Sequence, residues 1–318
     1  MKSKAFLLLL LLSCALCAMA QLIPPKEKYK TSVEPLLTTK WGQKKPFNQY
    51  CPTKTNASGE EESCPVGCVA LAIGQIMKYH NYPEHGKGYK SYTPLLSTKE
   101  ISADFENTYY KWDLMKDTYT SIGSKKFYTD EEADAVATLL FHTGVSVGTM
   151  YSLSGSSAFA YGNIPRDMIE DFRYAPDSIR YLSRSDYDKE KWVDLIFNEL
   201  TMGRPVFYAG NSPEYGGHAF VIDGYDSSGR FHINWGWKGT DNGYYDIDLT
   251  EGENNYCDNQ SMVIGIAPSF VTSEIRGIET TANSCEIYDI SGIRRNTLGR
   301  GMNIIRHSDG TICKVYIR

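Results

Sequence analysis

The sequence lacks the features that mark several broad classes of protein. Its 33 basic and 38 acidic residues give a formal net charge of −5 at pH 7 and form no basic stripe, so no nucleic-acid partner is expected. The apolar run Phe6 to Leu12 falls well short of the roughly 20 residues that cross a bilayer. Internal repeats and low-complexity tracts are also absent. With 42% hydrophobic residues, the chain is expected to be globular, with one or two domains and a large core.

The sequence also lacks a pattern of metal ligands. His80 and His85 are five residues apart, which does not place them on one helix face, and Pro83 lies between them. Asp241-Asn242-Gly243 matches only part of a calcium-binding loop and is better interpreted as a turn. We therefore expect neither a metal nor a cofactor.

The first 20 residues are predicted to form a secretory signal peptide. Lys2 and Lys4 precede the apolar run, and Ala18-Met19-Ala20 provides a small-residue cleavage site before Gln21. The protein is therefore expected to be exported, and to be secreted or held at the cell surface. Cys14 ends a segment that loosely matches a lipoprotein cleavage box, so lipid anchoring is the alternative.

Six of the eight cysteines lie beyond the signal peptide. An oxidising compartment permits disulfides, but spacing alone leaves the connectivity open. The pairings that the spacing suggests are Cys51 with Cys64 and Cys285 with Cys313, which would leave Cys68 and Cys257 single.

The stretch SCPVGCVALAIGQIMKYH, residues 63–80, predicts a buried helix that begins at Cys68. Apolar residues recur at the spacing of one helical face, and Pro83 limits the helix at its other end. Cys68 is thereby placed in the first turn, where unpaired N–H groups and the helix dipole favour a thiolate. The sequence thus predicts a nucleophile with a lowered pKa, and the alternative is a small buried structural cysteine.

The remaining periodicity predicts helices followed by strands. Helices are expected at 130–143, 165–173 and 187–201, the last started by Ser185, and the period changes to two after Pro205. This order predicts an α+β fold with a helical half and an antiparallel β half. The expected domains are a signal peptide at 1–20, a catalytic domain at 21–268 (helical lobe about 31–165, β lobe about 166–268) and a β-rich tail at 269–318.

Later residues supply the groups that a catalytic thiol needs. His218 opens a predicted strand and Asn234 lies in the partner strand of the same hairpin. An imidazole can serve the thiol as acid and base, an amide oxygen can orient the imidazole, and an indole such as Trp235 can shield that contact. Gln43 could join the Cys68 N–H as an oxyanion donor, although an ordinary surface glutamine is the alternative. These groups can meet only where the two halves meet, so we predict a site in a cleft.

Four longer motifs cover roughly residues 33–268: TTKWGQ, GCVALAIGQIMKYHNYP, GGHAFVIDGYD and HINWGWKGTDNGYY. In these motifs the chain resembles the streptopain family of secreted bacterial cysteine peptidases, within the papain-like superfamily. The resemblance implies a two-lobed papain-like fold with Cys68 as nucleophile and His218 as its partner. It also implies that Asn234 orients the histidine, that Trp235 shields that contact and that Gln43 completes the oxyanion hole.

Substrate binding is expected mainly in GVSVGTMYSLSGSSA, residues 144–158, which is similar to the part of the family that borders the non-prime subsites. Together with the resemblance, its apolar residues around Val145 favour a hydrophobic substrate side chain two places before the cut. The expected substrate-binding residues are Val147, Met150, Ser154, Gly155 and Ser156, together with Gly217 beside His218.

The predicted function is that of an exported cysteine endopeptidase. It would hydrolyse peptide bonds in protein or peptide substrates through a Cys68 thioester, with His218 as acid and base and without a cofactor. One alternative is an acyl transferase that uses the same thiol chemistry. The other is a surface binding or inhibitory protein that keeps the fold without turnover.

Two expectations concern the ends of the chain. Relatives in this family usually carry a long inhibitory pro-domain, whereas only residues 21–40 stand here between the signal peptide and the core. We therefore expect activity upon folding, with restraint by a separate protein inhibitor or by thiol oxidation. The tail, with its YDISG and KVYIR segments, resembles a shortened C-terminal sorting domain of type IX secretion.

Overall fold

The chain divides into two units, residues 1–269 and 270–318, and each is described by itself. The computed structural model describes residues 22–94, 99–159, 162–250, 255–269, 285–289, 292–295, 301–307 and 312–317. The predicted signal peptide and Cys14 lie outside the described residues. Within the described ranges, no helix is both long and apolar enough to cross a membrane.

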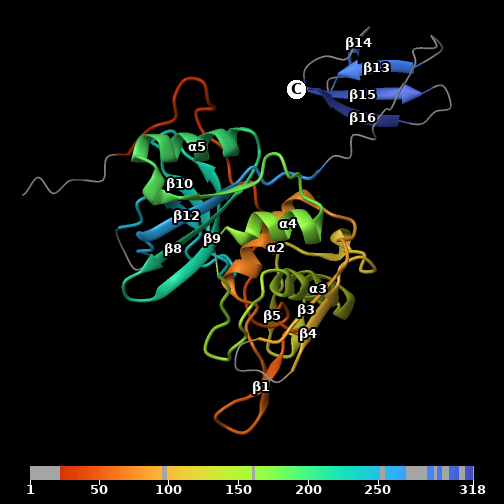
Figure 1. Cartoon of the computed structure of the whole chain (residues 1–318), viewed down its shortest axis with the longest axis vertical. Coiled ribbons are helices and arrows are strands. Elements are labelled where there is room, and N and C mark those ends of the chain that lie inside the picture. The colour runs from red at the N-terminus through yellow and green to blue at the C-terminus, as the bar shows by residue number, and fades with distance from the viewer. Residues whose placement is uncertain are drawn as a thin grey trace, which may run out of the picture. The chain divides into compact units, whose positions relative to one another are not determined.

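Three helices form one half of the first unit (Figure 1). The first helix begins at Cys68 and ends at His80, as predicted, and Asn81 beyond it adopts the left-handed conformation that commonly terminates helices. The second is fixed at its start by a capping box between Thr129 and Glu132. The bounds are α2 (Cys68–His80), α3 (Asp130–Ser146) and α4 (Asn163–Phe172).

Short hairpins occupy much of the sequence around these helices. The region 84–128, which shows no clear periodicity, contains two of them, because their strands are too short for an alternating pattern to be visible. The hairpin strands are β1 (Thr53–Thr55) with β2 (Glu61–Ser63), β3 (Tyr89–Tyr92) with β4 (Ile101–Asp104), and β5 (Ser121–Ile122) with β6 (Lys125–Lys126); η1 (Trp112–Leu114) is a short 3₁₀ helix.

The other half is an antiparallel sheet of six strands in the order β11-β10-β9-β8-β12-β7. Five of its strands lie in the region predicted to alternate, and the hairpin turn at Ser228-Gly229 joins two of them as predicted. The edge strand β7 was not predicted. The strands are β7 (Arg180–Ser183), β8 (Val206–Ser212), β9 (Gly216–Tyr225), β10 (Phe231–Asn234), β11 (Gly243–Tyr245) and β12 (Asp258–Ile264).

The fourth long helix, α5 (Lys189–Thr201), begins later than predicted. Its N-cap is Asp188, whose carboxylate accepts a hydrogen bond from the Lys191 N–H at 2.7 Å. The proposed cap, Ser185, instead lies in the short 3₁₀ helix η2 (Arg184–Asp186). The acidic side chain is favoured at the helix start because its charge opposes the positive end of the helix dipole.

The sheet separates two hydrophobic cores. Side chains alternate along β8, so Phe207 packs on the α2 and α3 side while Tyr208 packs on the α5 side, against Trp192. The neighbouring strand β9 repeats this alternation with Ala219 and Phe220. The observed architecture is therefore α+β, with the α2 end directed at the sheet face that carries Ala219.

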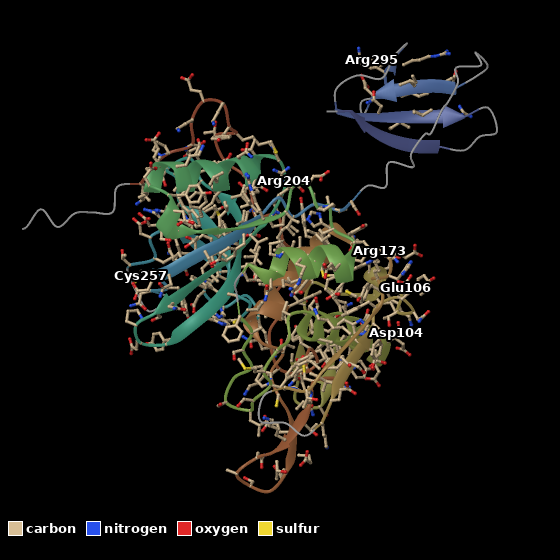
Figure 2. All side chains as sticks on the ribbon, viewed as in Figure 1. Asp104, Glu106, Arg173, Arg204, Cys257 and Arg295 are labelled. Atoms are coloured by element: carbon tan, nitrogen blue, oxygen red, sulfur yellow. The ribbon has the colours of Figure 1, made fainter. Side chains whose placement is uncertain are left out.

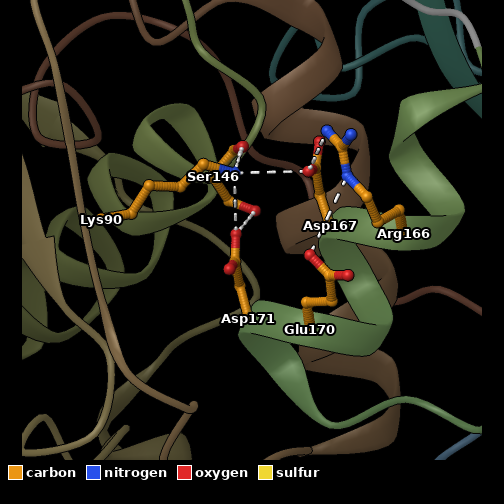
Figure 3. A network of polar contacts seen from close by, with 6 residues as sticks. All are labelled: Lys90, Ser146, Arg166, Asp167, Glu170 and Asp171. Atoms are coloured by element: carbon orange, nitrogen blue, oxygen red, sulfur yellow. Dashed lines mark hydrogen bonds and ion pairs between the residues drawn. The ribbon is translucent and has the colours of Figure 1, made fainter.

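A partly buried polar network links elements of the helical half (Figure 3). The Lys90 amine on β3 donates to the Ser146 carbonyl at the end of α3 (2.6 Å) and to the Asp167 and Asp171 carboxylates on α4 (3.3 and 3.2 Å). Ser146 Oγ also donates to Asp171 (2.7 Å), and Arg166 pairs with Asp167 (3.1 Å). One ammonium group thus links three elements.

The second unit is a small antiparallel sheet in the order β14-β13-β15-β16. Its strands are β13 (Cys285–Asp289), β14 (Arg294–Arg295), β15 (Gly301–His307) and β16 (Ile312–Ile317). A β-rich tail was predicted, and its role in sorting stays a prediction.

Among the cysteines whose side chains the structure describes, four carry free thiols: Cys51, Cys64, Cys68 and Cys257. The suggested Cys51–Cys64 disulfide is therefore not formed. The segment between these two cysteines is already closed by main-chain pairing of Thr53 with Ser63. The side chains of Cys285 and Cys313 lie outside the described part of the chain.

Candidate active site

Cys68 is placed at the start of α2 by a turn that favours glycine. Gly67 has φ +94°, a region that residues with a Cβ rarely adopt, and a Cβ there would lie 3.3 Å from the Ser156 carbonyl oxygen. The Gly67 carbonyl then accepts the first helical hydrogen bond from Leu71 (3.0 Å). Cys68 is thus oriented by its neighbour, and the Ala219 N–H of β9 lies within hydrogen-bonding distance of its sulfur.

The thiol of Cys68 is partly buried. Burial raises its pKa, and hydrogen bonds from the main-chain N–H groups of Ala219, Val69 and Cys68 act in the opposite direction without overcoming it. The lowered pKa expected from the helix start is therefore not found. The helix terminus could be inferred from sequence, but the depth of burial depends on the sheet that covers the thiol.

His218 lies on β9 directly before Ala219, and His218 and Cys68 line the same cavity. Its Nε2 is 2.9 Å from the Trp235 carbonyl oxygen. A carbonyl only accepts hydrogen bonds, so Nε2 carries the hydrogen and Nδ1 is left as the basic nitrogen. Burial lowers the pKa of His218 to about 4, so the imidazole is neutral at pH 7.

Aromatic rings surround the imidazole. Trp235 stacks on it at 6.2 Å between ring centroids, Trp237 stacks at 5.0 Å and Tyr256 lies at 5.2 Å. Rings in this position exclude water and can stabilise an imidazolium through their faces. Trp235 was expected here, whereas Trp237 and Tyr256 were not. Trp237 could have been found, since it alternates with Trp235 in the motif NWGW, but nothing marks Tyr256 among 23 tyrosines.

Asn234 is buried next to this contact but does not make it. Its Nδ2 donates to the Thr39 carbonyl (2.8 Å), and its Oδ1 accepts from Gly236 N (3.1 Å) and Gln75 Nε2 (3.3 Å). The expected direct contact between this amide and His218 is replaced by the carbonyl of the next residue, Trp235. Asn234 holds the turn that presents this carbonyl, so its proposed role becomes indirect.

Gln43 lies beside the start of α2. Its Oε1 accepts a hydrogen bond from Gly67 N (3.2 Å), and its main-chain carbonyl accepts from Val66 N (3.0 Å). Because the amide oxygen is held in this way, the Nε2 hydrogens are left for another acceptor near Cys68. This geometry suits an oxyanion donor, and that role stays a prediction.

A cavity of about 760 Å³ opens at Cys68 and His218. Gly217 lines it as expected, and so do Ser157, Ala158 and Phe159 at the end of the predicted substrate-binding segment and just beyond it. The earlier part of that segment is not in the lining. Val145 is fully buried, Val147 caps the end of α3, and Ser156 is buried. The expected residues outside the lining are Val147, Met150, Ser154, Gly155 and Ser156.

Part of the remaining cavity wall comes from β8, and the other part comes from β7, η2 and β12, which the sequence did not suggest. Cys257, labelled beside β12 in Figure 2, lies in this wall, so a second thiol shares the cavity with Cys68. The additional wall residues are Val69, Tyr181, Ser183, Arg184, Ser185, Ala209, Gly210, Asn211, Ala219, Asn259, Gln260 and Ser261. Within the described ranges, no group of three or more His, Cys, Asp and Glu side chains could hold a metal ion.

Residues 41–245 match the model of the peptidase C10 family, and this region contains Gln43, Cys68, His218 and Asn234. The chain belongs to the peptidase C10 family. It is 34% identical over 260 residues to streptopain of Streptococcus pyogenes, an alignment that covers 74% of this chain. The chain spans 63% of the length of these streptopains.

A second curated relative is the thiol protease/hemagglutinin PrtT of Porphyromonas gingivalis. It is 35% identical over 272 residues, which is 80% of this chain and 30% of the relative. Among solved structures, active interpain A cysteine protease of Prevotella intermedia superposes with a TM-score of 0.68 at 38% identity, covering 77% of this chain and 99% of that one. A prointerpain A fragment gives 0.66 at 37% identity, covering 77% and 76%. The papain-like cysteine-peptidase fold of the first unit follows from these similarities.

Proposed function

We propose that this protein is a cysteine peptidase that hydrolyses peptide bonds through a thioester on Cys68. The observation that carries the proposal is the arrangement of a partly buried thiol and a buried imidazole on one cavity. Cys68 starts α2 beside Ala219, and the adjacent His218 has its Nε2 hydrogen committed to the Trp235 carbonyl. This leaves Nδ1 of the imidazole for the thiol proton.

Each chemical step then has an assigned group. The Cys68 sulfur forms a bond to the substrate carbonyl carbon while its proton passes to His218 Nδ1, and the carbonyl oxygen becomes an oxyanion. The Cys68 N–H and the Gln43 amide donate to that oxygen. The C–N bond breaks as the imidazolium gives its proton to the leaving amine, which leaves the thioester. Water then attacks with the imidazole as base, the acid product leaves, and the thiol is restored.

The relatives support this proposal. Interpain A is described as a cysteine protease and PrtT as a thiol protease, and both match across most of this chain. Protein or peptide substrates, export from the cell and control by a separate inhibitor belong to the same proposal.

Replacement of the thiol tests the proposal. Cys68→Ala should lose several powers of ten in turnover of unstructured peptides while its circular dichroism and melting temperature stay near those of the wild type. A thiol-directed peptidyl inhibitor should label the wild type once, at Cys68, as found by mass analysis. Turnover within tenfold of the wild type, or a label on Cys257 alone, would contradict the assignment. Transfer of the acyl group to an added amine in place of water would support the acyl transferase.

A further inference from the structure

A row of small residues crosses the sheet away from the catalytic pair. Ala219 on β9 pairs with Ala209 on β8, Ala209 pairs with Ser261 on β12, and Ser261 pairs with Ser183 on β7. Directly paired residues point to the same face of a sheet, and all four line the cavity. With strands roughly 4.8 Å apart, the row extends about 14 Å from the strand that carries His218.

Arg184 stands at the far end of this row, directly after Ser183. Among the described residues that line the cavity, it alone carries a permanent charge. Its guanidinium donates to the Tyr187 carbonyl, and the guanidinium carbon lies 5.7 Å from the centroid of the Trp192 ring. No carboxylate of the described residues lies within ion-pair distance of it. The side chain is therefore held in place while its charge is not neutralised.

The wall around Arg184 suits an anionic group. Ser183, Asn259 and Gln260 are neutral and polar, so nothing in the described lining repels a carboxylate there. The end near Cys68 differs, because Ala209 and Ala219 form an apolar floor. The cavity thus changes along its length from small and apolar to polar and positively charged.

We propose that Arg184 determines specificity by binding an Asp or Glu side chain of the substrate. The inference rests on the proposed peptidase function. An extended peptide advances about 3.3 Å per residue, so a span of about 14 Å places the acidic residue within roughly four positions of the cut. The planar guanidinium can donate two parallel hydrogen bonds to one carboxylate, which an amide cannot accept in the same way. Glu is therefore preferred over its isostere Gln at one substrate position.

The experiment compares peptides in matched pairs. Each pair differs by Glu or Gln at one of the four positions on either side of the cut. The enzymes are the wild type, Arg184→Met and the control Arg180→Met, whose exposed arginine lies on the opposite face of β7. At one position the wild type should cleave the Glu peptide about tenfold faster in kcat/KM, as a charge-assisted hydrogen bond allows. Arg184→Met should lose this preference, and Arg180→Met should retain it.

Further variants separate the outcomes. Arg184→Lys keeps the charge without the planar fork and should show an intermediate preference, which also covers the case in which Arg184→Met fails to fold. A wild type without a Glu preference at any position, or an Arg184→Met variant that keeps the preference, overturns the inference.

If the wild type cleaves no peptide, the proposed function fails. The same peptide pairs are then titrated into the Cys68→Ala protein by fluorescence anisotropy. Tighter binding of the Glu peptide that depends on Arg184 supports the inference independently of catalysis. Equal binding of the Glu and Gln peptides contradicts it.

Discussion

Two regions of the first unit contain ionisable groups that are buried or partly buried. The regions differ in whether these groups have neighbours of opposite charge. In the Lys90 network the ammonium group lies 2.6–3.3 Å from one main-chain carbonyl and two carboxylates. Burial raises the pKa of Asp167, and Lys90 and Arg166 offset only part of that rise. His218 has one hydrogen bond and aromatic neighbours, and its charge is suppressed by burial. An ionisable group that forms ion pairs within the protein stabilises the structure. A group that is kept neutral beside a cavity can exchange a proton with a substrate.

The largest expected effect comes from removing the imidazole. His218→Ala should lower kcat by about 10²–10⁴-fold, because general acid–base transfer is lost. Asn234→Ala should cost less, no more than about 10²-fold, because Asn234 supports the turn that presents the Trp235 carbonyl and does not contact the imidazole. Both are measured on the same peptide at a temperature at which circular dichroism shows each variant folded. A larger loss in Asn234→Ala than in His218→Ala would reverse the assigned roles.

Removing the ammonium group tests the other region. Lys90→Met should reduce the free energy of unfolding by about 1–3 kcal/mol, because Asp171 loses its counter-charge and Asp167 keeps only Arg166; the partial exposure of Lys90 limits the loss. Peptide turnover of the folded variant should stay near that of the wild type. Lys126→Met removes the exposed pair with Asp130 and serves as the control, with an expected loss below about 1 kcal/mol. The free energies of unfolding are measured by urea denaturation. Equal losses in Lys90→Met and Lys126→Met would contradict the expected difference between the partly buried network and the exposed pair.

The smallest expected effect is a shift in the pH profile. Burial lowers the pKa of His218 to about 4 and raises that of Cys68, so both shifts favour the neutral pair. Protonation of this pair occurs only in acid, so the acid limb of kcat/KM should lie well below the ordinary imidazole pKa of about 6.5. Trp237→Ala should admit water to His218 and move the acid limb to higher pH, because burial would lower the pKa of the imidazole less. The profile is measured with an uncharged peptide from about pH 4 to pH 10. An acid limb at or above 6.5 in the wild type would contradict the argument.

Much of the site could be predicted because its residues carry local signals. Periodicity, with Gly67 before it and Pro83 beyond it, located the helix that begins at Cys68, and alternation located the strand that carries His218. The cavity wall from β7 and η2 had no such signal, since a four-residue edge strand followed by one short turn of helix shows no period. Arg184 was therefore not predicted, although it is the charged residue of the cavity lining.

The sequence by itself determined which chemical groups the protein has, the helix that carries Cys68 and the hairpin that carries His218 and Asn234, because helix and strand periods are local properties of the chain. Only the tertiary structure decided how those groups behave. The direction of the Cys68 pKa depends on burial under β9, and the partner of His218 depends on how the turn after Asn234 is held. Both follow from packing between segments far apart in the sequence, where desolvation outweighs the helix dipole and a main-chain carbonyl lies nearer than an amide side chain.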